Sequence, residues 1–239
     1  LRISTGGKLA LRDDSSDSMP ATLIDLDSAE INGTLTAASD SPRTNEILPS
    51  EIDMLNINNG GSVRLNGNLK SNVADVSGEL SLRNGMTGIL SAQRLEVRSG
   101  GTVSVRELDV DVANVSGNLT ISQLRAMPTR QTALNISAGG TAKLQSGETL
   151  STLSIAEGGI LEVGESMAGN TAFTTLQTTS EVTTRIDGRL DSQSRNTSLI
   201  FADRLEIGTS GFVDAIRLEA ETVEINGRLV LQNGRSDEA

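Results

Sequence analysis

The stretch LEVRSGGTVSVRELDVDVANVSGNLTI, residues 95–121, decides the fold of this chain. Its apolar residues alternate strictly with polar ones: Leu95, Val97, Val103, Val105, Leu108, Val110 and Val112. Such alternation is the period of a strand with one buried face. Gly100-Gly101 and Gly117 lie between the alternating runs, and glycine tolerates the backbone angles of a sharp turn. The stretch therefore predicts three strands joined by two corners.

Two motifs recur along the whole chain. The first, Leu-x-Ile/Val-x-x-Gly-Gly, starts at Leu1, Leu55, Leu95, Leu134 and Leu153, with a degenerate copy at Leu205. Three of the intervals between these starts are 40, 39 and 19 residues, close to multiples of the roughly 20 residues of a short solenoid repeat. The two longer intervals require insertions.

The second motif, apolar-x-Gly-x-Leu, interleaves with the first. Its copies start at Ile31, Leu65, Val76, Val115, Ile186 and Ile225. Because Asn-Gly between apolar runs is also a hairpin signal, an antiparallel meander or sandwich is the alternative fold. A pattern that returns after each full circuit, however, favours coils stacked in parallel.

We therefore expect an all-β fold: a right-handed, single-stranded parallel β-helix, or solenoid, with projecting loops, forming one domain over residues 1–239. At about 20 residues per coil the chain would give on the order of twelve coils and a rod of about 55 Å. Proline cannot donate to a strand ladder, and all four prolines lie in irregular polar segments. The loops are predicted near residues 13–21, 37–50, 122–133, 165–175 and 191–197.

The repeats reach both ends of the sequence. The first starts at Leu1 and the last runs from Ile225 to Leu231, close to the terminus. Open strand edges invite further pairing. We therefore expect a segment of a longer or processed chain, with at least one end coil abutting another coil.

Composition excludes several classes of function. The net charge of −11, with 31 acidic against 20 basic residues, disfavours nucleic acid and anionic membrane surfaces as partners. No run of 18 apolar residues occurs, so insertion of this segment into a membrane is not expected. The absence of cysteine and histidine from the sequence rules out disulfides, thiolate and imidazole metal sites, and Ser-His-Asp catalysis.

The runs LNINNGGSVRLNGNL, LEVRSGGTVSV and LSIAEGGILEV resemble coils of secreted parallel β-helix proteins, in particular bacterial autotransporter passengers and filamentous-haemagglutinin-like adhesins. This resemblance implies a right-handed β-helix, an extracellular or cell-surface location, and adhesion or self-association. The apolar-x-Gly-x-apolar steps are also similar to bactofilins, cytoplasmic polymer-forming β-helices. The long loops that contain proline depart from the compact bactofilin pattern.

Asp109 and Asp111 are candidate catalytic residues. They flank Val110, so an inward Val110 would place both carboxylates on one outer face about 7 Å apart, a separation that inverting glycosidases use. The competing interpretation, which we favour, is a solvated strand face, because no neighbours that would split the two pKa values are visible. The same interpretation applies to two other acid pairs: Asp25 and Asp27, and Glu219 and Glu221.

Asp13, Asp14 and Asp17 are candidate calcium ligands, because they cluster in a serine-rich segment with many oxygen donors. The sequence lacks EF-hand spacing and the Gly-x-Asp spacing of calcium-binding repeats, so surface solvation is favoured and no cofactor is expected. Five Asn-x-Ser/Thr sequons, at Asn32, Asn114, Asn118, Asn135 and Asn196, are possible N-glycosylation sites. Serine and threonine are so abundant that chance also explains these sequons.

We expect an extracellular structural or adhesive rod and not an enzyme. Its partners would be further copies of itself, other surface proteins or glycans, contacted through loops that project from a rigid scaffold. Three alternatives remain: a carbohydrate-active β-helix enzyme, a bactofilin-like cytoskeletal polymer, and a glycosylated extracellular fibre protein of eukaryotes. Three phenylalanines, Phe173, Phe201 and Phe212, are expected to fill a wider core or to pack a loop.

Overall fold

The computed structural model describes residues 1–13, 24–39, 50–82, 88–122, 132–145, 148–164, 174–179, 182–192 and 197–232. Every regular element in these ranges is a β-strand. Membrane-crossing helices are accordingly absent from the described ranges. The strands form two sheets in which all pairs are parallel, which confirms the predicted solenoid and excludes the meander.

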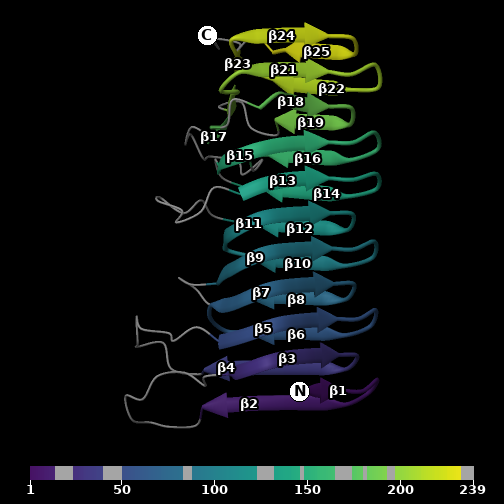
Figure 1. Ribbon diagram of the computed structural model, residues 1–239, viewed down its shortest axis with the longest axis vertical. Helices are drawn as coiled ribbons and strands as arrows, with labels where there is room; N and C mark the ends of the chain where they lie inside the picture. Colours follow the sequence, from purple (N-terminus) through teal and green to yellow (C-terminus); the bar gives the residue numbers. More distant parts are fainter. Residues whose placement is uncertain are drawn as a thin grey trace, which may run out of the picture.

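The two sheets alternate along the chain, as Figure 1 shows. Sheet A has fourteen strands: β1 (Arg2–Ile3), β3 (Asp25–Ile31), β5 (Ser50–Ile57), β7 (Leu69–Val76), β9 (Ile89–Val97), β11 (Glu107–Val115), β13 (Thr132–Ile136), β15 (Glu148–Ile155), β17 (Thr174–Thr178), β18 (Thr184–Ile186), β20 (Thr197–Ile200), β21 (Arg204–Ile207), β23 (Arg217–Glu219) and β24 (Thr222–Ile225). Sheet B has eleven: β2 (Lys8–Asp13), β4 (Thr34–Ser39), β6 (Ser62–Leu65), β8 (Glu79–Leu82), β10 (Thr102–Val105), β12 (Asn118–Ile121), β14 (Thr141–Leu144), β16 (Ile160–Val163), β19 (Arg189–Ser192), β22 (Phe212–Ala215) and β25 (Arg228–Leu231).

Each coil contains one strand of sheet B, so we number the coils 1 to 11 from β2 to β25. At about 4.8 Å per step, eleven coils give a rod of about 50 Å. In Figure 1 the strands of sheet A run to the right in front, and those of sheet B return to the left behind as the chain climbs. This winding is right-handed, as connections between parallel strands almost always are.

The long strands of sheet A bend in the middle, which gives the coils that contain them three sides. In β9, Leu90 and Ala92 point inward, the next two residues are exposed, and Leu95 and Val97 point inward again. The alternation has therefore shifted by one residue at the bend. The same shift in β11 leaves Val112 half-buried and turns Ala113 into the core. The expectation of strict alternation through Val112 is wrong for this reason.

In coils 9 to 11 the bend opens into a gap between two strands. β15 pairs with both β17 and β18, and the split continues as β20 with β21 and β23 with β24. In coil 6 the single strand β11, residues 107–115, covers this part of the coil. In coil 10 the same part takes residues 197–207, and the residues between β20 and β21 form a separate corner. Phe201 lies at this corner and is 3% exposed, which confirms its expected place in the core.

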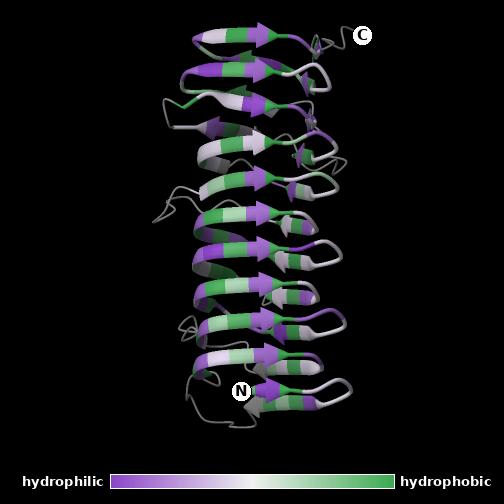
Figure 2. Ribbon diagram, turned by 45° about the vertical axis from the view of Figure 1, so that its right-hand side comes forward, coloured by the Kyte–Doolittle hydropathy of each residue, from purple (hydrophilic) through white to green (hydrophobic). Residues whose placement is uncertain are grey.

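The core is a set of apolar columns that run the length of the rod. The inward positions appear as aligned green bands in Figure 2. One column of sheet B contains Leu9, Leu35, Val63, Leu80, Val103, Leu119, Ala142, Leu161, Leu190, Val213 and Leu229. Since each residue covers the one below, aliphatic side chains of similar size fill this column without aromatic rings.

The strands reach further into the predicted loops than expected. β4 extends to Ser39 and β5 begins at Ser50, while β13 begins at Thr132. β17 begins at Thr174, and β19 and β20 cover the margins of the last predicted loop. The interiors of all five predicted loops lie outside the described residues.

Candidate interaction surface

Each coil passes from sheet A to sheet B through a glycine-containing turn, and the stacked turns form one edge of the rod, here named the turn edge. Six turns are long: Ser4–Gly7, Asn58–Gly61, Arg98–Gly101, Ser137–Gly140, Ala156–Gly159 and Gly208–Gly211. Five are short: Asn32-Gly33, Ser77-Gly78, Ser116-Gly117, Asp187-Gly188 and Asn226-Gly227. Long and short turns alternate except at coils 7 and 8, where two long turns are adjacent.

The long turns are β-turns that require a glycine at their third position. In the turn of coil 3, Gly61 N–H donates to Asn58 O at 2.8 Å, and Gly60 has φ of 80°. Positive φ at this position defines a type II turn. The turn of coil 10 differs, because it holds Ser210 there and none of the described non-glycine residues has positive φ.

The last glycines of the turns stack in a column along the rod, and glycine is required in this column for a different physical reason. Its members are Gly7, Gly33, Gly61, Gly78, Gly101, Gly117, Gly140, Gly159, Gly188, Gly211 and Gly227. A Cβ on Gly101 would lie 2.1 Å from the carbonyl oxygen of Val76, one coil below. From coil 2 onward, the N–H of the residue after each of these glycines donates to the carbonyl of the glycine below, as Thr102 N–H does to Gly78 O at 2.8 Å. Glycine is therefore needed here for close backbone approach.

Where a short turn lies between two long ones, the turn edge has a notch. The notch at coil 4 has a volume of about 350 Å³. Gly60 and Gly100 form its lower and upper walls, and Ser77 and Gly78 form its floor. Asn59 and Ser99, the second residues of the two flanking turns, are exposed tips. The notch is open to solvent and lined mainly by small polar groups.

Polar side chains form hydrogen-bonded ladders on the outer surface of sheet A. Asn114 Nδ2 donates to Glu96 Oε1 at 2.7 Å, and Asn135 Nδ2 donates to Asn114 Oδ1 at 3.0 Å. At the turn edge, Asn58 Nδ2 donates to Asn32 Oδ1 at 3.0 Å. These bonds join successive coils, so they add to the backbone ladder and stiffen the rod.

Ion pairs neutralise charges close to the notch. Arg98 makes two hydrogen bonds to Asp75, at 2.7 and 2.6 Å. These bonds, together with the charge of Asp75, raise the pKa of the Arg98 guanidinium. Arg64 Nη2 contacts both carboxylate oxygens of Glu79, at 3.2 and 3.0 Å. The one carboxylate that lines the notch is therefore already paired with an arginine.

Phe212 lies on the outer surface of sheet B, which rules out a wider core, the first of the two places expected for it. Its ring is half-buried between Arg189 and Arg228, whose guanidinium carbons are 5.3 and 5.4 Å from the ring centroid. Stacked cations on both faces make Phe212 part of an outer ladder. Phe173 lies outside the described residues.

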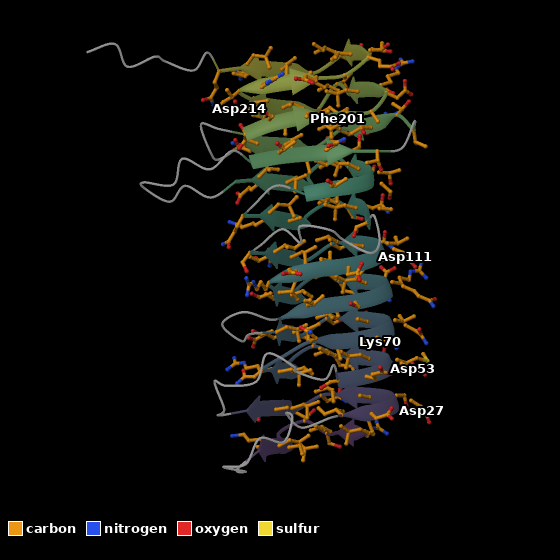
Figure 3. All side chains as sticks on the ribbon, turned by 90° about the vertical axis from the view of Figure 1, so that its left-hand side faces the viewer. Asp27, Asp53, Lys70, Asp111, Phe201 and Asp214 are labelled. Atoms are coloured by element: carbon orange, nitrogen blue, oxygen red, sulfur yellow. The ribbon has the colours of Figure 1, made fainter. Side chains whose placement is uncertain are left out.

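The candidate catalytic pair does not share one exposed face. Val110 points inward as expected, but Asp109 is only 5% exposed, whereas Asp111 is exposed. The expectation of two solvated carboxylates side by side is therefore wrong for Asp109. The other two pairs are exposed: Asp25 and Asp27 on β3, and Glu219 and Glu221 at β23. Figure 3 shows Asp27 and Asp111 along the same corner of the rod.

The candidate calcium ligands cannot be placed as a group. Asp13 ends β2, and Asp14 and Asp17 lie outside the described residues. Within the described part of the chain, no three acidic side chains gather as a metal site would require.

The sequons occupy three kinds of position. Asn32, Asn114 and Asn135 use their side-chain amides in the ladders described above. Asn118 is exposed at the start of β12, and Asn196 lies outside the described residues. A glycan on Asn114 or Asn135 would replace an N–H at an amide nitrogen that joins two coils, and one on Asn32 would do so at the nitrogen that donates to Glu30 of the same coil. Asn118 is therefore the described sequon best placed for modification.

The alternation of long and short turns was missed by the sequence interpretation, although the signal is present as Gly-Gly in one motif and a single Gly in the other. The sequence matches no protein-family model, and neither a curated protein nor a solved structure is significantly similar to it. The repeats of the chain itself therefore carry the argument about its function.

Proposed function

We propose that the chain is an extracellular structural or adhesive rod. The observation that supports this proposal is the continuity of the stack: eleven coils share an apolar core and a backbone ladder, and outer side-chain ladders join several of them. Such a rod acts as a stiff spacer, and it presents a new row of outward side chains at every step of about 4.8 Å.

A repeated surface suits partners that are themselves repetitive or extended. The outer positions are mostly Ser, Thr, Asn and paired charges, which can exchange hydrogen bonds with surface proteins, glycans or further rods without desolvating isolated charges. The mechanism is mechanical and interfacial: many weak contacts along a rigid edge act together because the rod holds them in register.

The test combines location and binding. Protease treatment of intact cells of the source organism should digest the chain, and the purified chain should bind those cells or a glycan panel in a saturable manner. The heat-unfolded chain is the control for non-specific adsorption. A chain protected inside intact cells, with no saturable binding in either screen, would contradict the proposal.

A further inference from the structure

Each notch of the turn edge has the height of one coil along the rod axis. Long turns two coils apart are separated by about 9.6 Å, twice the strand spacing, so a notch leaves the width of one further strand. In the N-terminal half, short turns at coils 2, 4 and 6 alternate with long turns at coils 1, 3, 5 and 7, so the order of turns that forms the notch at coil 4 recurs on both sides of it. This half of the turn edge therefore repeats with a period of two coils.

The walls of the notch carry unused backbone groups. At coils 7 and 8, where two long turns are adjacent, Gly139 N–H donates to Gly158 O at 3.1 Å. The equivalent groups around coil 4 are the N–H of Gly60 and the C=O of Gly100. Neither has a protein partner within the described part of the chain, because the short turn between them stops before it reaches them.

Charge is distributed unevenly along the turn edge. In a chain with 21% charged residues, every turn tip and notch floor from coil 1 to coil 7 is uncharged: Thr5, Asn32, Asn59, Ser77, Ser99, Ser116 and Ala138. Acids take the same positions only in coils 8 and 9, at Glu157 and Asp187, whereas Thr209 and Asn226 of coils 10 and 11 are again uncharged. Depletion of charge is the compositional mark of the centre of a protein interface.

We infer that the N-terminal half of the turn edge is a self-association surface, in which the long turns of a second copy enter the notches of the first. The two rods run in the same direction, offset by one coil, so that an inserted turn accepts from Gly60 N–H and donates to Gly100 C=O. The adjacent long turns of coils 7 and 8 end the contact, since no double notch exists in the described turn edge to receive them. This inference rests on the proposed function and names one partner, a second copy of this chain.

Charge reversal at the tips tests the contact directly. Asn59 and Ser99 are exposed and neither has positive φ, so substitutions there leave the fold intact. Sedimentation velocity from about 1 μM to about 1 mM should show wild-type dimers, weakened at least about tenfold in both N59E/S99E and N59K/S99K. An equimolar mixture of the two variants should dimerise again, because opposite charges then meet across the notch. Thr209→Glu, at the equivalent tip of coil 10, is the matched control and should dimerise like wild type.

Three results would overturn the inference: a wild-type chain that stays monomeric throughout this range, a mixture that stays monomeric, or a Thr209→Glu chain that is weakened as much as N59E/S99E. Circular dichroism of each variant verifies the fold. If N59E/S99E were unfolded, N59K/S99K would still test the inference: it should dimerise more weakly than wild type and Thr209→Glu. A monomeric wild type that nevertheless binds cells would refute self-association and leave the proposed function standing.

Discussion

Neighbouring glycines in the turn of coil 5 should respond very differently to the same substitution. Gly100 has φ of 81° and open space around its Cβ position, whereas a Cβ on Gly101 would lie 2.1 Å from Val76 O and 2.9 Å from Arg98 O. Gly100→Ala therefore introduces left-handed backbone strain of about 1 to 2 kcal/mol without a clash. The loss of unfolded-state freedom offsets part of this, so the net destabilisation should be about 1 kcal/mol.

Gly101→Ala must separate two coils. Ordinary contact begins near 3.4 Å, so the Cβ and the carbonyl oxygen of Val76 have to move apart by more than an ångström. The hydrogen bonds from Thr102 N to Gly78 O and from Asn118 N to Gly101 O, at 2.8 and 2.9 Å, lie in the displaced region. Two lost bonds at about 1 kcal/mol each, with overpacking strain of about 1 to 3 kcal/mol, give a destabilisation of about 3 to 5 kcal/mol.

Urea unfolding followed by far-ultraviolet circular dichroism measures both variants against wild type. Because a solenoid can unfold in parts, hydrogen exchange should also locate the loss, with Gly101→Ala lowering protection in β10 and β12. Gly100→Asn is a useful control, since asparagine tolerates positive φ better than alanine. Equal destabilisation by Gly100→Ala and Gly101→Ala would refute the assignment of the glycine column to close backbone approach.

Three further outcomes are expected. Thr197→Val should raise the free energy of unfolding by about 1 kcal/mol, because the buried Thr197 hydroxyl has no partner in the described structure. Thr132→Val should lower the free energy of unfolding by about 1 kcal/mol, because Thr132 Oγ1 donates to Val110 O at 2.9 Å. Urea midpoints that shift in the same direction for both variants would contradict these two assignments. The raised pKa of Arg98 means that its stabilising charge is present at all lower pH values and is lost only as pH rises through that pKa. Because the ion pair is exposed, Arg98→Gln should change the free energy of unfolding by less than about 1 kcal/mol. Thermal melts at several pH values should show that this difference stays constant between neutral pH and about pH 10. Chelation with EDTA should leave the melting temperature unchanged, and a clear fall would revive the calcium site proposed for the segment that begins at Asp13.

Much of the fold could be predicted because stacking repeats one constraint in every coil. A residue directly above another must match it in size and polarity, so the inward columns and the glycine column appear in the sequence as two motifs. The bend in the long strands could not be predicted in this way. Val112 and Ala113 are both apolar, and the choice of which one faces the core depends on where β11 turns, not on alternation.

The candidate sites were harder to predict, because burial of an outward residue depends on what covers it. Asp109 and Asp111 are equivalent in the local pattern, yet one is 5% exposed and the other is exposed. Phe212 was expected in a wider core or against a loop, but its register with Arg189 and Arg228 places it in an outer column. Both cases depend on which residues of neighbouring coils lie beside each other, and these residues are more than about 15 positions apart in the sequence. The periodicity of a single strand carries no information about that pairing.

The same reasoning indicates where function should be sought in such a rod. The core columns and the glycine column are fixed by stacking, so their composition says little beyond the fold. Outer positions are free to vary, and here they carry Ser, Thr and Asn mixed with charges of both signs. The seven uncharged tips and floors of coils 1 to 7 depart from that mixture although stacking does not require it. Because stacking does not explain the absence of charge at these positions, we attribute it to contact with a second surface at the turn edge.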